Sequence, residues 1–234
     1  MMKKSRFDKS EKATQEVTHE RHRKNEAENT HGFDFLRTLA LDLGATEARV
    51  IAAEDIVVEN RVALKCRIGC DDYGKKLTCP PFTPTPEEFR KMLKDYKYAL
   101  IVKFKSPAEA DKDVSRSLLR SQYDSTMSRD LREKSSKFWS DWKNDKKRIL
   151  LAVLELEKTA FNKGYTFAVG FTSGSCGLCE KCNVQVGICL HPTMARCPEH
   201  AVGVNMKKTA EKAGVPITFP IKGKPEPTAL LLID

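Results

Sequence analysis

Eight cysteines, gathered into two separate stretches, constrain this chain more than any other feature of its sequence. They stand at Cys66, Cys70 and Cys79 in the first stretch and at Cys176, Cys179, Cys182, Cys189 and Cys197 in the second. A disulfide scaffold is usually a short secreted chain with cysteines distributed throughout. The grouping therefore favours metal ligation in a reducing compartment over disulfide bonds.

The second cysteine group has the spacing of an iron–sulfur site. Its first three cysteines follow the pattern C-x2-C-x2-C. Two-residue gaps let one tight loop direct three sulfurs at one cubane cluster, and the fourth ligand then comes from elsewhere. Cys189 completes the pattern C-x2-C-x2-C-x6-C, while Cys197 competes as the fourth ligand. The sequence thus predicts a 4Fe–4S cluster held by Cys176, Cys179, Cys182 and Cys189.

Zinc is the alternative metal for this second group. Structural zinc more often uses two separated C-x2-C pairs, or one pair with histidines. A zinc ion would take the three closely spaced cysteines together with Cys189 or His191. Gly170, Gly174 and Gly177 allow close backbone approach, so their amides are candidates to donate hydrogen bonds to cluster sulfide.

The first cysteine group has the spacing C-x3-C-x8-C-P-P and no obvious local fourth ligand. We expect it to lie in a loop rich in glycine and proline. Three interpretations stay open: Cys66, Cys70 and Cys79 hold a second cluster with one open iron, share a cluster completed by Cys197, or are buried structural thiols. Nearby basic side chains would favour thiolates electrostatically.

The pattern of apolar residues predicts one α/β domain over residues 31–234, with α+β as the alternative. Its central mixed sheet carries flanking helices and cysteine-rich metal-binding loops. The expected strands lie at 48–52, 56–58, 98–104, 167–171 and 229–233. The expected helices cover 35–43, 86–95, a segment starting at 106, 146–163 and 205–213.

Two further segments differ in composition from this core. Residues 1–30 are charged and almost lack large apolar side chains, which predicts a disordered tail. A highly charged helical insert near 107–163 carries an aromatic cluster of Phe138, Trp139 and Trp142. Ordinary packing explains that cluster more simply than a platform for ligand stacking.

Composition excludes several classes of protein. The chain has 41 basic and 32 acidic residues, a net charge of +9, but the basic residues are scattered among acids. Nucleic acid is therefore not the expected partner. No apolar run is long enough to span a membrane, and the first residues lack the apolar core of a signal peptide, so we expect a cytoplasmic protein. Walker A, dinucleotide-binding and Gly-x-Ser-x-Gly motifs do not occur.

The cysteine motifs resemble those of the prokaryotic "predicted metal-binding protein" family, domain of unknown function 2284. The resemblance rests on Cys66-Arg67-x-x-Cys70, Tyr73-Gly74-Lys75, Cys79-Pro80-Pro81, residues 96–101, Gly174-Ser175-Cys176-x2-Cys179-x2-Cys182, Cys189-x-x-Pro192 and Ala195-Arg196, within residues 36–214. It implies metal binding, with no established reaction. By the same resemblance, Cys66, Cys70 and Cys79 match the family's N-terminal set and the four closely spaced cysteines its C-terminal set. Cys197 departs from the family pattern, where a small non-cysteine residue is usual.

Three functions are consistent with these features. The first is electron transfer to a redox partner protein, because full four-cysteine ligation leaves no iron site open to substrate. The second is an iron–sulfur enzyme, in which an open iron at the first cysteine group acts as a Lewis acid beside Asp71, Asp72, Tyr73 and Lys75. The third is a structural zinc module that mediates protein or nucleic-acid interaction. The sequence specifies neither a substrate nor an oligomeric state.

Overall fold

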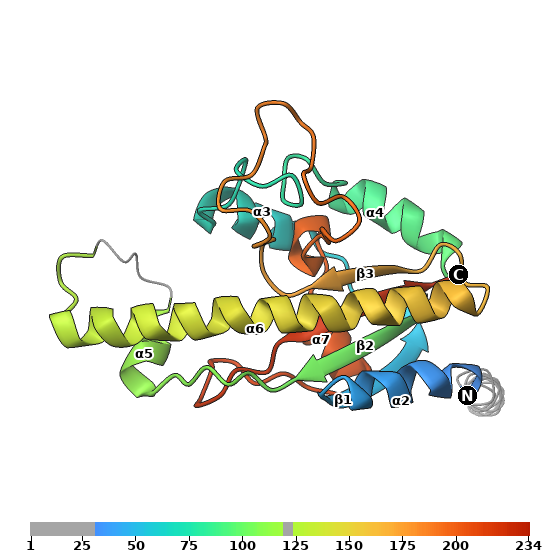
Figure 1. Ribbon diagram of the computed structural model, residues 1–234, viewed down its shortest axis with the longest axis horizontal. Coiled ribbons are helices and arrows are strands. Elements are labelled where there is room, and N and C mark those ends of the chain that lie inside the picture. The colour runs from blue at the N-terminus through green and yellow to red at the C-terminus, as the bar shows by residue number, and fades with distance from the viewer. Residues whose placement is uncertain (1–30, 119–123) are drawn as a thin grey trace, which may run out of the picture. The chain divides into compact units, whose positions relative to one another are not determined.

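The computed structural model describes residues 31–118 and 124–234 (Figure 1). It divides the chain into two compact units, residues 1–35 and 36–234. The described part of the first unit is a 3-10 turn, η1 (His31–Phe33), and the start of helix α2 (Asp34–Asp42). The disordered tail that we predict for residues 1–30 lies outside the described residues.

The second unit is built on an open four-stranded sheet in the order β1-β2-β4-β3. The strands are β1 (Ala45–Ala52), β2 (Tyr98–Phe104), β3 (Val169–Thr172) and β4 (Thr228–Ile233). β2 and β4 are buried along almost their whole length, as their central position requires. The predicted α/β class, with helices packed on a central sheet, is confirmed.

The pairing in this sheet differs from the mixed sheet that we expected. All of the named strands pair antiparallel, and the parallel component among the described residues is one isolated bridge between Thr172 and Pro198. The reason is topological, because β4 inserts between β2 and β3 and runs opposite to both. The strands on either side of helix α6 in the sequence therefore do not meet as a parallel pair.

Helix α6 (Arg129–Asn162) is continuous through the predicted insert and the predicted helix at 146–163. Figure 1 shows its second half lying across the sheet, while its first half extends past the sheet toward α5. Its apolar second half packs on the sheet, and the side chain of Val153 stands against the backbone of Gly170 in β3. The exposed face of its first half is lined by ion pairs one turn apart, such as Lys137 with Asp141.

The opposite face of the sheet carries another part of the core. Ile101, Leu230 and Phe171 project from the strands into this cluster. It is covered by α4 (Pro86–Met92), η3 (Leu93–Asp95), η4 (Glu199–Val202) and α7 (Met206–Lys212). The predicted capping box at Thr85 and Glu88 begins α4, and helix 205–213 is also confirmed in α7.

Three local predictions are wrong. The strand expected at 56–58 makes only an isolated bridge, between Val58 and Val204, after the short turn η2 (Ala53–Asp55). The helix expected from Ser106 begins later, as α5 (Lys112–Ser117), because residues 106–110 are extended and bond to the backbone of 223–225. Helix α3 (Asn60–Gly69) covers part of the stretch that we expected to be a loop.

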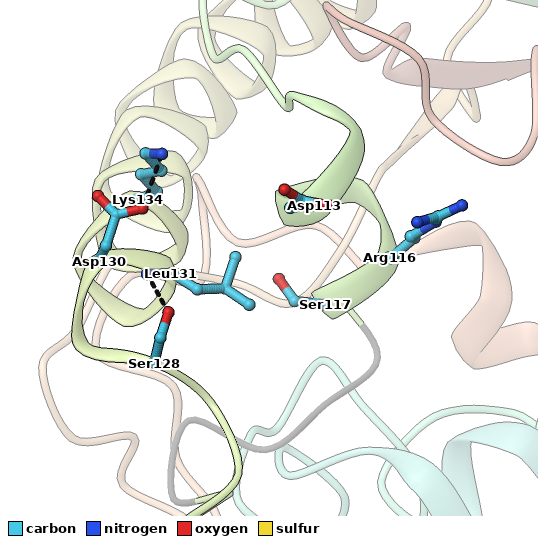
Figure 2. A pocket seen from close by; sticks show the side chains of 7 residues that line it. All are labelled: Asp113, Arg116, Ser117, Ser128, Asp130, Leu131 and Lys134. Atoms are coloured by element: carbon cyan, nitrogen blue, oxygen red, sulfur yellow. Dashed lines mark hydrogen bonds and ion pairs between the residues drawn. The ribbon is translucent and has the colours of Figure 1, made fainter.

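Helix α5 meets the first turn of α6 around a small polar pocket (Figure 2). Asp130 and Lys134 form an ion pair along α6 at 2.8 Å, and Ser128 accepts a hydrogen bond from the amide of Leu131. Two of the charges that line this pocket are thus paired with each other within α6. None of its lining residues is a cysteine.

Candidate metal centre

The two cysteine-bearing segments lie together at one end of the sheet. Residues 70–85 follow α3 and residues 173–198 follow β3, and both form loops beside α3 (Figure 1). The backbone amide of Leu77, in the first loop, donates a hydrogen bond to Cys182 Sγ in the second at 3.4 Å. All eight cysteines are free thiols. The fold therefore brings two cysteine groups together that stand far apart in the sequence.

Four thiols of the second group line one cavity. These are the four cysteines of the C-x2-C-x2-C-x6-C pattern, Cys176, Cys179, Cys182 and Cys189. Lys76, Leu77 and Thr78 of the first loop close the cavity from the other side. The amide of His191 donates to Cys189 Sγ at 3.4 Å. The four cysteines of the C-x2-C-x2-C-x6-C pattern thus border a common cavity.

The thiols of this cavity are close enough to affect one another's protonation. Burial is the main cause that raises the pKa of Cys176, and the charges of Cys179 and Cys189 raise it further. A hydrogen bond from the backbone of Leu178 acts in the opposite direction. A thiol in this setting is neutral unless a cation stabilises its thiolate, and a bound metal supplies such a charge.

The donor set fits an iron–sulfur cluster in type and number. It consists of four free thiols around one cavity, with a backbone amide directed at one sulfur. Within residues 31–118 and 124–234, no three His, Cys, Asp or Glu side chains converge closely enough to hold a metal ion. The four sulfurs therefore share a cavity without forming a closed ligand set.

The first cysteine group is arranged differently. Cys66 lies within α3, Cys70 caps the end of that helix and is exposed, and Cys79 is buried in a turn. The location of Cys66 corrects the expectation that the whole group lies in a loop. Burial, followed by the charges of Asp72 and Cys70, raises the pKa of Cys79 to about 12. The three thiols share one neighbourhood, in which Cys66 donates a long hydrogen bond to the carbonyl of His200 at 3.9 Å.

Cys197 lies apart from the cavity of the other four thiols in its group. It packs against the hydrophobic core beside the end of β3. Its carbonyl accepts a hydrogen bond from the amide of Thr172, the last residue of that strand, at 3.1 Å. Burial raises the pKa of its thiol, while the neighbouring Arg196 acts in the opposite direction. Its position is that of a core cysteine near the site.

A lysine that the motifs did not indicate lies between the two cysteine groups. Lys146 of α6 donates a hydrogen bond from Nζ to the carbonyl of Ser175 at 2.9 Å. Burial lowers the pKa of Lys146, whereas the charges of Asp72 and Cys176 raise it. The sequence places Lys146 at the start of an amphipathic segment but contains no signal that it reaches the cysteines. The contact exists only because α6 crosses the sheet beside the second loop.

Arg196 and Glu157 fix the second cysteine segment to α6. The Arg196 guanidinium contacts both carboxylate oxygens of Glu157, through Nε at 2.6 Å and through Nη2. Glu157 also accepts a hydrogen bond from the amide of Gly170. A Cβ at Gly170 would lie 2.2 Å from the side chain of Val153. Gly170 therefore serves close helix–strand packing, not the approach to a cluster that we expected of it.

The fold and this site define a cysteine-rich α/β protein whose two thiol groups meet in helix α3 and the loops beside it, next to an antiparallel sheet. The chain belongs to the family described as predicted metal-binding protein (DUF2284), which it matches over residues 49–233. The match extends from β1 through β4 and includes both cysteine groups. No curated protein and no solved structure matches the chain. Among the described residues, no helix has the length and apolar composition needed to cross a membrane.

Proposed function

We propose that this protein is a cytoplasmic iron–sulfur protein, with a 4Fe–4S cluster on Cys176, Cys179, Cys182 and Cys189, that passes electrons to a partner protein. The observation that carries the proposal is the single cavity lined by these four free thiols. Binding requires the four side chains to turn toward one another within a loop that contains neither helix nor strand. When bound, the cluster supplies one-electron redox chemistry.

The polypeptide around the thiols is compatible with a bound cluster. The amide of Leu77 directed at Cys182 Sγ is the kind of hydrogen bond that sets the reduction potential of iron–sulfur centres. The apolar side chains of Leu77 and Leu178, both half-buried, line the cavity together with the exposed Leu190. Four-cysteine ligation would leave no iron open to substrate, which suits electron transfer without substrate binding.

The charges beside the cavity indicate an acidic partner. Lys143, Lys146, Lys147 and Arg196 line a neighbouring hollow of about 200 Å³ that also contains Cys176. Lys143 and Lys147 are exposed, so their charges are available at the surface. A redox partner with an acidic patch would be steered to this face, and its association would weaken as ionic strength rises.

The metal content tests the proposal. The protein is purified without oxygen, and iron, acid-labile sulfide and zinc per chain are measured together with a visible spectrum. We expect about four irons and four sulfides with a brown absorption band. Zinc without sulfide or colour would overturn the proposal and favour the structural zinc module.

One observation favours the enzyme alternative as a second candidate. Cys66, Cys70 and Cys79 lie in one neighbourhood with Asp72, and Lys146 stands between this neighbourhood and Cys176. A second cluster there would have three cysteine ligands and one iron open to substrate. The same metal assay separates the two candidates, since a second cluster would raise the content to about eight irons and eight sulfides.

A further inference from the structure

A second cavity, larger than the thiol cavity, opens between α3, α6, α7 and the segment before β4. Its volume is about 590 Å³, within the range of sites that hold small organic molecules. Its lining is largely apolar and contains no cysteine. The segments that carry the cysteines also form one side of it, through Val62 of α3 and through Ser173 and Gly174 after β3.

The apolar wall of this cavity is aromatic. Phe138, Trp139 and Trp142 of α6 all line it, as does Phe219. Phe138 and Trp142 are nearly parallel, with ring centroids 6.2 Å apart, and Phe138 meets Trp139 edge to face. Phe138 is buried in a small core cluster, which confirms packing as its role, but Trp139 remains 48% exposed. A flat ring is the shape that such a wall accommodates best.

One polar side chain lies among these apolar residues. Glu199 is fully buried and lines the cavity. Its Oε1 accepts hydrogen bonds from the hydroxyls of Ser173 at 3.1 Å and Thr228 at 3.5 Å. Its Oε2 has no hydrogen-bond partner within the described part of the chain, and His200 Nδ1 is 3.9 Å away, too far for a hydrogen bond. A buried oxygen left without a partner is costly, and a ligand N–H or O–H would satisfy it.

The exposed charges that line the cavity are mainly positive. They belong to Arg61, Lys65 and Lys207. Arg61 pairs with Glu59 at 2.6 Å and Lys207 with Glu211 at 3.8 Å. Lys65 makes no ion pair with any residue of the described ranges, so its charge is available for an anionic group on a ligand.

We propose that this cavity binds a planar aromatic molecule that has an anionic group at one end and an N–H or O–H donor on its ring system. The aromatic wall of α6 receives the rings, Lys65 pairs with the anion, and Glu199 Oε2 accepts the hydrogen bond. This site is separate from the thiol cavity, so the proposal does not depend on which metal the cysteines hold.

Two matched probes test the proposal on the purified full-length chain. The first is 8-anilinonaphthalene-1-sulfonate, which has flat rings, an N–H donor and an anionic group. The second is N-phenyl-1-naphthylamine, which has the same rings and N–H but no charge. Binding is measured by calorimetry. Both tryptophans of the chain line the cavity, so quenching of their fluorescence reports whether the probe occupies this site.

We expect both probes to bind one per chain and to quench the tryptophan emission. Lys65→Glu should weaken binding of the sulfonate by about tenfold and leave the uncharged probe unchanged. Lys94→Glu makes the same charge change on η3, away from the cavity, and should affect neither. An equal loss for both probes, or an equal effect of Lys94→Glu, would overturn the assignment of Lys65.

Two further variants test the wall and the buried acid. Trp139→Ala should weaken the binding of both probes by about tenfold. Phe161 is an exposed aromatic residue on the same helix but outside the cavity, so Phe161→Ala should leave both affinities unchanged. Glu199→Leu removes both acceptor oxygens and should also weaken the binding of both probes, and circular dichroism shows whether this variant is folded. If neither probe binds stoichiometrically to the unaltered chain, or if Trp139→Ala leaves both affinities unchanged, the cavity is not the binding site that we propose.

Discussion

Each cysteine group brings three or four thiols close together, but the two groups do so in different ways. In the second group, short spacing within one loop is enough to place four thiols around one cavity. In the first group, one thiol lies in a helix, one at the helix end and one in a buried turn. Local sequence therefore defines the second group, whereas the first depends on how α3 and the following loop pack. We expect the second group to be the main metal site.

Replacing one cysteine in each group gives the largest expected contrast. Cys182→Ser removes a thiol from the cavity and also the acceptor of the Leu77 amide, so we expect it to lose most of its iron and sulfide. Cys70→Ser changes an exposed thiol of the first group and should retain the full content. Iron and sulfide per chain, measured after anaerobic purification, check both variants.

The same assay tests Cys197 as the fourth ligand. Cys197→Ser should leave the iron content unchanged, because Cys197 packs against the core and Cys189 lines the cavity. If Cys197→Ser lost iron while Cys189→Ser kept it, the ligand set would be wrong. A loss of iron in Cys70→Ser would instead show that the two groups act together.

The next effect concerns the anchoring of the second segment to α6. Glu157→Gln removes the charge that the Arg196 guanidinium contacts, and both side chains are mostly buried. We expect the free energy of unfolding to fall by about 2 kcal/mol, because the Arg196 charge then lacks its partner. Glu155→Gln is the matched control on the same helix, where an exposed pair with Lys158 contributes under about 0.5 kcal/mol.

Urea unfolding followed by circular dichroism measures both changes. Equal midpoints for Glu157→Gln and Glu155→Gln would show that the contact between Arg196 and Glu157 does not hold the second segment to the fold. Within the described residues, no arginine joins the first group to α6 in this way. Its loop is held instead by hydrogen bonds such as that from the Thr83 hydroxyl to the carbonyl of Ala201 at 3.2 Å.

A smaller effect is expected from the lysine between the two groups. Lys146→Met removes a partly buried positive charge near Cys176. A positive charge stabilises the more negative, reduced state of a cluster, so the variant should have a reduction potential lower by tens of millivolts, on the order of one Coulomb interaction at an effective dielectric constant of about 20. Lys147→Met, its exposed neighbour, should shift the potential much less. Redox titration of both variants tests this prediction. Equal shifts in potential would show that Lys146 has no special effect on the metal site.

Much of the core could be predicted from the sequence, because local signals determine it. The apolar run of β2, the capping box before α4 and the cysteine spacing at 176–189 are all short-range patterns. The order of the strands could not be predicted in this way, since the insertion of β4 between β2 and β3 depends on contacts across the whole chain. Helix α3 could not be predicted for a related reason: none of its residues is buried in the core, so its sequence lacks a strong apolar pattern.

The candidate site likewise combines residues that the local sequence predicts with residues that only long-range contacts bring in. The four thiols of one cavity follow from spacing, but Lys146, Glu157 and Glu199 act through contacts that bridge distant segments. Gly170 shows the difference most clearly. Its position before the cysteines suggested a role at the cluster, but the space beside it is taken by Val153 and Glu157 of α6.

The smallest expected effect lies at the junction between the first cysteine loop and the core. The Thr85 hydroxyl accepts a hydrogen bond from the amide of Glu88, and the Glu88 carboxylate accepts one from the amide of Thr85 at 2.8 Å. Thr85→Ala should lower the free energy of unfolding by about 1 kcal/mol, because the first turn of α4 loses its cap. Thr85→Ser keeps the hydroxyl and should lie close to the unaltered chain. Both variants should retain their iron, because Thr85 and Glu88 lie outside the four cysteines that we propose as the cluster ligands. A loss of iron in Thr85→Ala alone would show that the cap of α4 also controls the metal site.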